Sequence, residues 1–146
     1  MELKYEKIYA PGTDVGLKVT KGHFATNHAH TNYYIDLTTI KSRVSEAQEI
    51  ARALVHMYLY DMVVDTIVCM EGTLLAEELT KGGFLSLNAH KTIYIIKPEF
   101  NSNSQIMFKD NFRPMLNGKN VILLTATVTT GLTINKGIEG IQYYGG

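Results

Sequence analysis

Short apolar runs alternate with segments of helical periodicity from residue 45 to the end of the chain. The runs are rich in β-branched residues and lie at Asp65–Met70, Thr92–Ile96 and Val121–Leu124. The helical patterns fall before, between and after them, at 45–60, 74–81 and 132–144. Strands that are apolar along their whole length and separated by helices form parallel sheets covered on both faces. The chain is therefore predicted to be an α/β protein with a doubly wound, mostly parallel sheet.

The first forty residues follow a different pattern, rich in Gly, Thr, Tyr and His. This pattern predicts short strands and turns, with a strand over Tyr33–Leu37. A length of 146 residues suits one domain, and no stretch has the composition of a linker. We therefore expect a single domain over 1–146, with an N-terminal segment at 1–40 and an α/β core at 41–146.

Local signals predict where two helices begin. Ser45 and Gln48 have the spacing of a capping box, and Thr73 is a suitable N-cap for the next helix. That second helix is expected to end at Gly82–Gly83. The polar stretch at 99–119 carries no such signal and is predicted to be irregular.

Composition and charge exclude several classes of protein. Fourteen Lys and Arg balance 14 Asp and Glu, so a broad electrostatic grip on nucleic acid or anionic lipid is not expected. The single cysteine, Cys69, excludes an intrachain disulfide framework and a cysteine-rich zinc site. No apolar run approaches the roughly 20 residues that cross a bilayer, and Met1–Lys7 lacks the apolar core of a signal peptide. We expect a cytoplasmic protein with neither nucleic acid nor membrane as a partner.

The segment Val121–Thr133 carries the clearest functional signal. A buried strand passes into a small, hydroxyl-rich turn that opens a helix, where free backbone amides and the positive helix end attract a phosphate monoester. Thr129, Thr130 and Thr133 would add hydroxyl donors, and Gly131 would let an anion approach the backbone. The alternative is a plain connection in which the threonines only cap the helix. The other strand end that would face the same edge of the sheet is Glu71–Thr73.

The segment Val121–Thr133 resembles the phosphoribosyl-pyrophosphate motif of the type I phosphoribosyltransferases. The order of elements around it is similar to that of the orotate phosphoribosyltransferases. The resemblance implies a small N-terminal hood at 1–40, a pyrophosphate loop within Val68–Leu79 and a mobile catalytic loop at 99–118. It also implies a phosphoribosyl ligand, a Mg²⁺ ion if the chain is active, and a homodimer.

The resemblance assigns site residues to three groups. The phosphate-binding residues are Thr127, Val128, Thr129, Thr130, Gly131, Leu132 and Thr133. The ribose and pyrophosphate side is formed by Thr125, Ala126, Glu71, Gly72 and Thr73. The cations of the mobile loop are Lys97, Lys109 and Arg113. No residue is assigned a catalytic role, and no protein ligand set for a metal is expected.

The sequence departs from the family at the positions that carry the catalytic residues. The family's motif has two adjacent acids that hold the ribose hydroxyls and stabilise the developing ribosyl cation, but here these positions are Thr125 and Ala126. The stretch at 99–118 has no histidine, and Thr26–Thr31 replaces the Ser-Gly pair and lysine of the hood. We therefore expect weak or lost transferase activity.

Two functions stay open on this evidence. One is an orotate phosphoribosyltransferase-like enzyme, and the other is a non-catalytic protein of the same fold that binds a ribose 5-phosphate ligand or dimerises. Paired tyrosines at 33–34, 58–60 and 143–144 favour a subunit interface. The chain ends at Gly146, where the family continues into a further strand, so either a fragment or a sheet whose edge is covered by a partner is expected.

Overall fold

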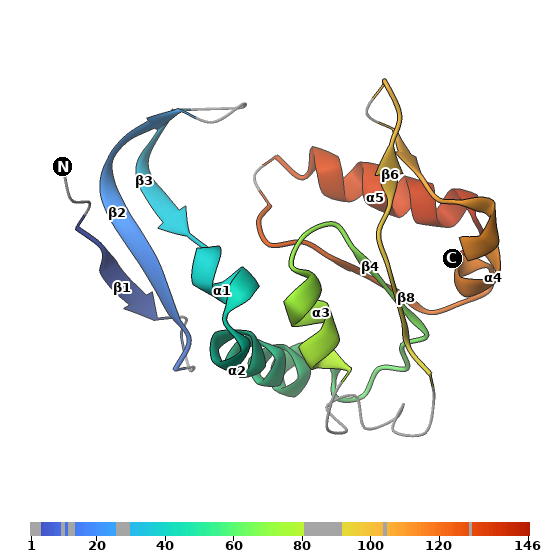
Figure 1. Cartoon of the computed structure of the whole chain (residues 1–146), viewed down its shortest axis with the longest axis horizontal. Coiled ribbons are helices and arrows are strands. Elements are labelled where there is room, and N and C mark those ends of the chain that lie inside the picture. Colours follow the sequence, from blue (N-terminus) through green and yellow to red (C-terminus); the bar gives the residue numbers. More distant parts are fainter. Residues whose placement is uncertain are drawn as a thin grey trace.

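The computed structural model describes residues 4–9, 11, 14–25, 30–80, 92–103, 105–128 and 130–146. An antiparallel sheet at the N-terminus stands beside a mixed core of strands and helices (Figure 1). The N-terminal sheet has the order β1-β2-β3 and consists of β1 (Glu6–Tyr9), β2 (Gly16–Ala25) and β3 (His30–Asp36). The predicted strand at Tyr33–Leu37 is confirmed as the second half of β3.

The core is built on a parallel sheet of the order β5-β4-β8, as the apolar runs predicted. Its strands are β4 (Thr66–Cys69), β5 (Tyr94–Ile96) and β8 (Val121–Leu124). Its main helices are α1 (Thr38–Ser42), α2 (Val44–Leu54), α3 (Thr73–Leu79) and α5 (Leu132–Tyr143). A π-helical turn, Val55–Leu59, extends α2. No helix of the described ranges has the length and apolar character needed to cross a membrane.

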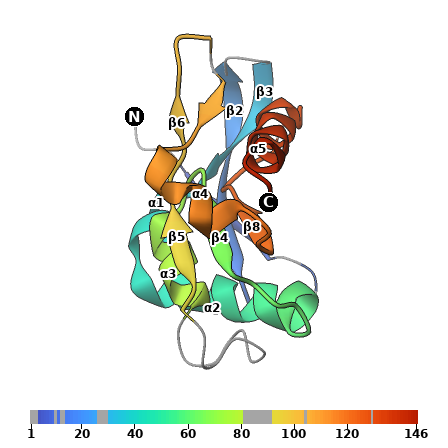
Figure 2. The same ribbon diagram turned by 90° about the vertical axis from the view of Figure 1, so that its right-hand side faces the viewer.

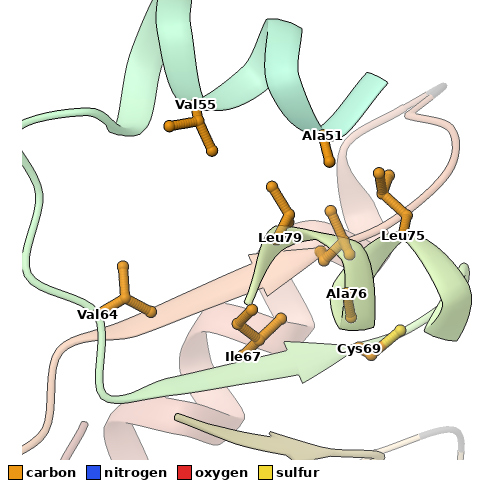
Figure 3. Close-up of a cluster of buried hydrophobic side chains, with 9 residues drawn as sticks. Ala51, Val55, Val64, Ile67, Cys69, Leu75, Ala76 and Leu79 are labelled. Carbon is orange, nitrogen blue, oxygen red and sulfur yellow. The ribbon is translucent and has the colours of Figure 1, made fainter. Parts of the chain in front are cut away.

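Apolar side chains cover both faces of the parallel sheet. On one face, Ile67 and Cys69 of β4 pack against α2 and α3 through Ala51 and Leu79 (Figure 3). On the other face, Val68 packs in a second cluster that contains side chains from α4 (Arg113–Leu116) and α5. In Figure 2, α4 and α5 lie in front of the strands and α3 lies behind them. Alternate residues of β4 therefore pack into opposite cores, which explains why every residue of the strand is buried.

The order in which strands are added to the sheet reverses at β4, between β5 and β8. The chain leaves β4, adds β5 on one side, and then returns to add β8 on the other side. The amide of Met70 donates to the carbonyl of Leu124 at 2.8 Å, so the carboxyl ends of β4 and β8 lie together. Crevices at such reversal points are the usual ligand sites of parallel α/β sheets.

The stretch at 99–119 is structured, and the prediction of an irregular segment is wrong. Its elements are β6 (Glu99–Phe100), β7 (Ile106–Met107), a 3₁₀ turn (Asp110–Phe112) and α4 (Arg113–Leu116). Ile106, Phe108 and Leu116 are buried in the second cluster. They belong to two short apolar runs, Ile106–Phe108 and Met115–Leu116, which are too brief within a polar stretch to indicate an element by periodicity.

The predicted caps are wrong in detail. The α2 helix begins at Val44, with Arg43 at its N-cap and no side-chain cap bond, because the short helix α1 ends directly before it. Ser45 therefore lies inside the first turn. Thr73 is the first helical residue of α3, and Gly72, at φ 88°, takes the N-cap position. The predicted stop at Gly82–Gly83 lies outside the described residues.

Candidate functional site

The carboxyl ends of β4 and β8 open into one cavity of about 580 Å³. Four of the predicted site residues line it together: Glu71, Gly72, Thr125 and Ala126. They meet because Cys69 pairs with Leu124 at the last register position of the two parallel strands. The structure therefore brings the two predicted strand ends to one place.

The walls of this cavity are mostly apolar. The N-terminal sheet contributes Leu17, α1 contributes Ile40, and α2 contributes Ile50 and Leu54. On the opposite side, α3 contributes Leu75. The cavity is thus enclosed where the N-terminal sheet and the helices α1, α2 and α3 converge on the strand ends. Most of these wall residues were not predicted, because no local signal links segments so far apart.

An ion pair is set into the apolar wall. The ammonium of Lys41, in the last turn of α1, contacts the carboxylate of Glu71, which follows β4. Their side chains are 37% and 43% exposed, so water screens much of the attraction. Glu71 was predicted to lie on the ribose and pyrophosphate side. In the structure its carboxylate is held by Lys41, which the sequence analysis missed.

The β8–α5 loop, residues 125–131, leads from the cavity to the surface. Gly131 has φ 80°, and a Cβ built there would meet nothing within 4 Å. The Thr125 hydroxyl donates to the Thr127 carbonyl at 3.4 Å, and the Leu132 amide donates to the Thr130 hydroxyl at 3.3 Å. Thr130 thus accepts a hydrogen bond from the first amide of α5, while Gly131 holds the N-cap position without a side-chain cap bond.

The predicted phosphate-binding residues lie largely at the surface. Among those described, the exposed ones are Thr127, Val128, Thr130, Leu132 and Thr133, and Gly131 is half-buried. Thr129 lies outside the described residues. Because the loop precedes a helix of 12 residues, its amides lie at the positive end of a helix dipole. The loop offers backbone donors to an anion that arrives from solvent.

The three predicted loop cations do not line the cavity. Lys109 lies 3.6 Å from the carboxylate of Glu99, and both side chains are exposed. The guanidinium of Arg113 stacks over the ring of Tyr144 at 5.0 Å, at the far end of α5 from the loop. Lys97 is exposed just beyond β5. Lys109 and Arg113 are therefore engaged away from the cavity, whereas Lys97 lies at the carboxyl edge of the sheet, where its charge acts on the Cys69 thiol.

Cys69 and Thr73 do not line the cavity. Burial raises the pKa of the Cys69 thiol, and a hydrogen bond from Thr73 only partly offsets this effect. A thiol must ionise to attack or to bind a metal. Cys69 is therefore a core residue of β4.

The histidines near the N-terminal sheet do not form a metal centre in the described part of the chain. His23 and His30 face each other across β2 and β3, with their ring nitrogens 3.0 Å apart. His28 lies outside the described residues. Within the described ranges, no group of three His, Cys, Asp or Glu side chains has the arrangement needed to hold a metal ion.

Comparisons with known proteins establish the fold. No protein-family model matches the chain, and no curated protein matches its sequence. A structure of Mycobacterium tuberculosis H37Rv orotate phosphoribosyltransferase in complex with Fe(III) dicitrate matches with a TM-score of 0.59 and 16% identity. That match covers 89% of this chain and 72% of the other chain. The same enzyme in complex with inorganic phosphate matches with a TM-score of 0.53 and 17% identity, over 88% and 69%. The chain therefore has a phosphoribosyltransferase-like fold.

Proposed function

We propose that this protein binds a ligand bearing ribose 5-phosphate, including phosphoribosyl pyrophosphate, at the joined ends of β4 and β8. The observation that carries the proposal is the β8–α5 loop, which runs from the cavity lining at Thr125 and Ala126 through exposed residues to the start of a helix. The phosphoribosyltransferase-like fold supports it, as does the phosphate-bound form of the similar enzyme. In this proposal the loop amides hold the phosphate, while Thr125 and Ala126 lie beside the ribose.

We propose in addition that transfer to a base is weak or absent. A ribosyl cation forms during transfer, and negative charge must be placed to stabilise it. Thr125 and Ala126 offer a hydroxyl and a methyl group, and the carboxylate of Glu71 is neutralised by Lys41. The described walls of the cavity contain no other acid.

The same residues are a poor fit for a magnesium ion. Mg²⁺ takes oxygen ligands, usually one or two carboxylates together with phosphate oxygens and water. Glu71 is the one carboxylate in the described wall, and a cation already holds it. We therefore derive no step that depends on Mg²⁺ and propose that binding does not require it.

Calorimetry with ribose 5-phosphate and with phosphoribosyl pyrophosphate, each with and without Mg²⁺, tests the proposed function. Each charge-assisted hydrogen bond contributes about 1.5–3 kcal/mol before ordering and desolvation costs. The expected affinity lies between millimolar and micromolar, about −4 to −8 kcal/mol, and does not change with Mg²⁺. Absence of binding would refute the proposal. Binding of phosphoribosyl pyrophosphate that appears only with Mg²⁺ would favour the enzyme instead.

We also propose that the protein is a homodimer that uses its N-terminal sheet. Ile8, Tyr33 and Ile35 lie on one face of this sheet by the register of β1, β2 and β3, and all three side chains are exposed. Leu17 and Val19 share that face but are turned into the protein, so the proposed interface is the exposed part of the face around Ile8, Tyr33 and Ile35.

Light scattering at tens of micromolar tests this assembly. A dimeric mass is expected, and Ile8→Asp with Ile35→Asp should give monomers because it places charge in the interface. A monomeric wild-type protein would contradict the proposal.

One of the tyrosines that were expected at an interface is not available for it. Tyr144 is buried, and its hydroxyl is hydrogen-bonded to the backbone of Phe108.

A further inference from the structure

The chemistry of the cavity differs from that of the loop beside it. Its volume of about 580 Å³ is well within the range of small-molecule sites, roughly 300–1,000 Å³. We infer that the ligand carries, on the anomeric carbon of its ribose, a large uncharged ring system that is mainly apolar, and that this ring occupies the cavity. The inference rests on the proposed function and names the class of ligand.

The first argument is the composition of the walls. Aliphatic side chains from the N-terminal sheet, α1, α2 and α3 surround the space, among them Leu17, Ile40, Leu54 and Leu75. Lys41 and Glu71 are the charged side chains in the described lining, and they neutralise each other. An apolar ring gains free energy by leaving water for such walls, whereas an ionised group would lose its hydration.

The second argument is the position of the cavity. Thr125 and Ala126 belong to its lining and also begin the loop that is proposed to hold the phosphate. One ligand can therefore reach both places, with its phosphate at 127–133 and its ring among the aliphatic side chains. The ribose would lie at the boundary, beside Thr125 and Ala126.

The third argument is the poor fit of orotate, a pyrimidine carboxylate. Its ring carbonyls and N–H groups need hydrogen-bond partners when buried, and its carboxylate needs a free cation. The described lining offers the hydroxyls of Tyr58 and Thr125 and an ammonium that Glu71 already holds. The methyl group of Ala126 continues an apolar wall, where a carboxylate would be costly. The replacement of the motif's acid at this position agrees with an apolar ligand.

Three ligands test the inference by calorimetry: ribose 5-phosphate, orotidine 5′-phosphate, and a 1-naphthyl C-riboside 5′-phosphate. The naphthyl compound is expected to bind at least tenfold more tightly than ribose 5-phosphate. Orotidine 5′-phosphate is expected to gain less than threefold. The three compounds share the ribose phosphate, so the differences report on the cavity alone.

Ala53→Phe provides the matching variant, because Ala53 lines the cavity from α2. The added ring should fill the space, remove the naphthyl gain and leave ribose 5-phosphate binding unchanged. Ser45→Phe adds the same group at an exposed position of the same helix and should change neither affinity. If Ala53→Phe fails to fold, Met57→Trp narrows the cavity from a residue that is 48% exposed.

The outcomes separate the two proposals. Failure of ribose 5-phosphate to bind defeats the proposed function, and the inference falls with it. Binding of ribose 5-phosphate without a naphthyl gain, or with an equal gain for orotidine 5′-phosphate, overturns the inference alone. A naphthyl gain that persists in the cavity-filling variant also overturns it, because the ring would then lie elsewhere.

Discussion

The two halves of the site are neighbours but differ in how they are built. The β8–α5 loop is one contiguous segment whose donors are mainly backbone amides, whereas the cavity is assembled from the N-terminal sheet, three helices and two strand ends. Most side-chain substitutions leave backbone donors in place, whereas an apolar wall depends on the packing of the side chains that form it. Phosphate binding and turnover are thus expected to separate in this protein, since the residues at the boundary, Thr125 and Ala126, carry no charge.

The largest effect on ligand binding is expected from a substitution that obstructs the loop and leaves the cavity unchanged. Gly131→Val should abolish phosphate binding, a loss of about 4–8 kcal/mol, because the side chain enters the open space beside the loop. Gly118→Val is the matched control: it has φ 68°, compared with 80° at Gly131, and a Cβ there also meets nothing within 4 Å. Both variants carry the same kind of left-handed strain, and only Gly131 adjoins the site. Calorimetry with ribose 5-phosphate that shows equal affinities in both variants would make the loop purely structural.

The next effect concerns turnover at the boundary between loop and cavity. Two lost hydrogen bonds to charged groups, at about 1.5–3 kcal/mol each, remove roughly 3–6 kcal/mol of transition-state stabilisation. At about 1.4 kcal/mol per decade this is on the order of 10²- to 10⁴-fold in rate. A coupled assay for pyrophosphate release with orotate and other bases should show the wild type well below 1 s⁻¹, with Thr125→Asp/Ala126→Asp as the comparison. Wild-type turnover of about 1 s⁻¹ or more would make the transferase assignment the better one.

Two leucines of α3 compare the cavity wall with the packed core. Leu79 is 1% exposed and fully surrounded, while Leu75 borders the cavity. Leu79→Ala should lower the free energy of unfolding by about 3–5 kcal/mol, since it leaves a new void in close packing. Leu75→Ala should cost about 2–3 kcal/mol, because part of its surface already faces open space. Urea unfolding measures both, and equal losses would mean that the cavity closes in solution.

The smallest expected effect is that of the ion pair. Lys41→Met and Glu71→Gln should each change the free energy of unfolding by less than about 1 kcal/mol, because both side chains are partly exposed. A double-mutant cycle isolates their coupling, which should weaken further in 1 M salt. A coupling above about 2 kcal/mol would show that the pair is shielded from water and acts as part of the wall.

The correct parts of the sequence analysis all start from contiguous segments. The apolar runs predicted β4, β5 and β8 and their parallel pairing, and the segment after β8 predicted the loop and α5. The predicted strand ends do meet at one place. The cap predictions at Ser45 and Thr73 were wrong because each helix begins earlier than the local spacing implied. Arg43, directly after α1, is the N-cap of α2, and Gly72 is the N-cap of α3.

The alternation of strands and helices follows from the sequence, since apolar periodicity reports which face of each segment is buried. The character of the site depends on how the folded chain packs. This packing brought Leu17, Lys41 and Leu75 to the same cavity as Ala126, paired Lys41 with Glu71 and turned Arg113 toward Tyr144. Periodicity acts over a few residues, whereas a cavity depends on how distant segments pack, so its shape and polarity emerge only when the chain has folded.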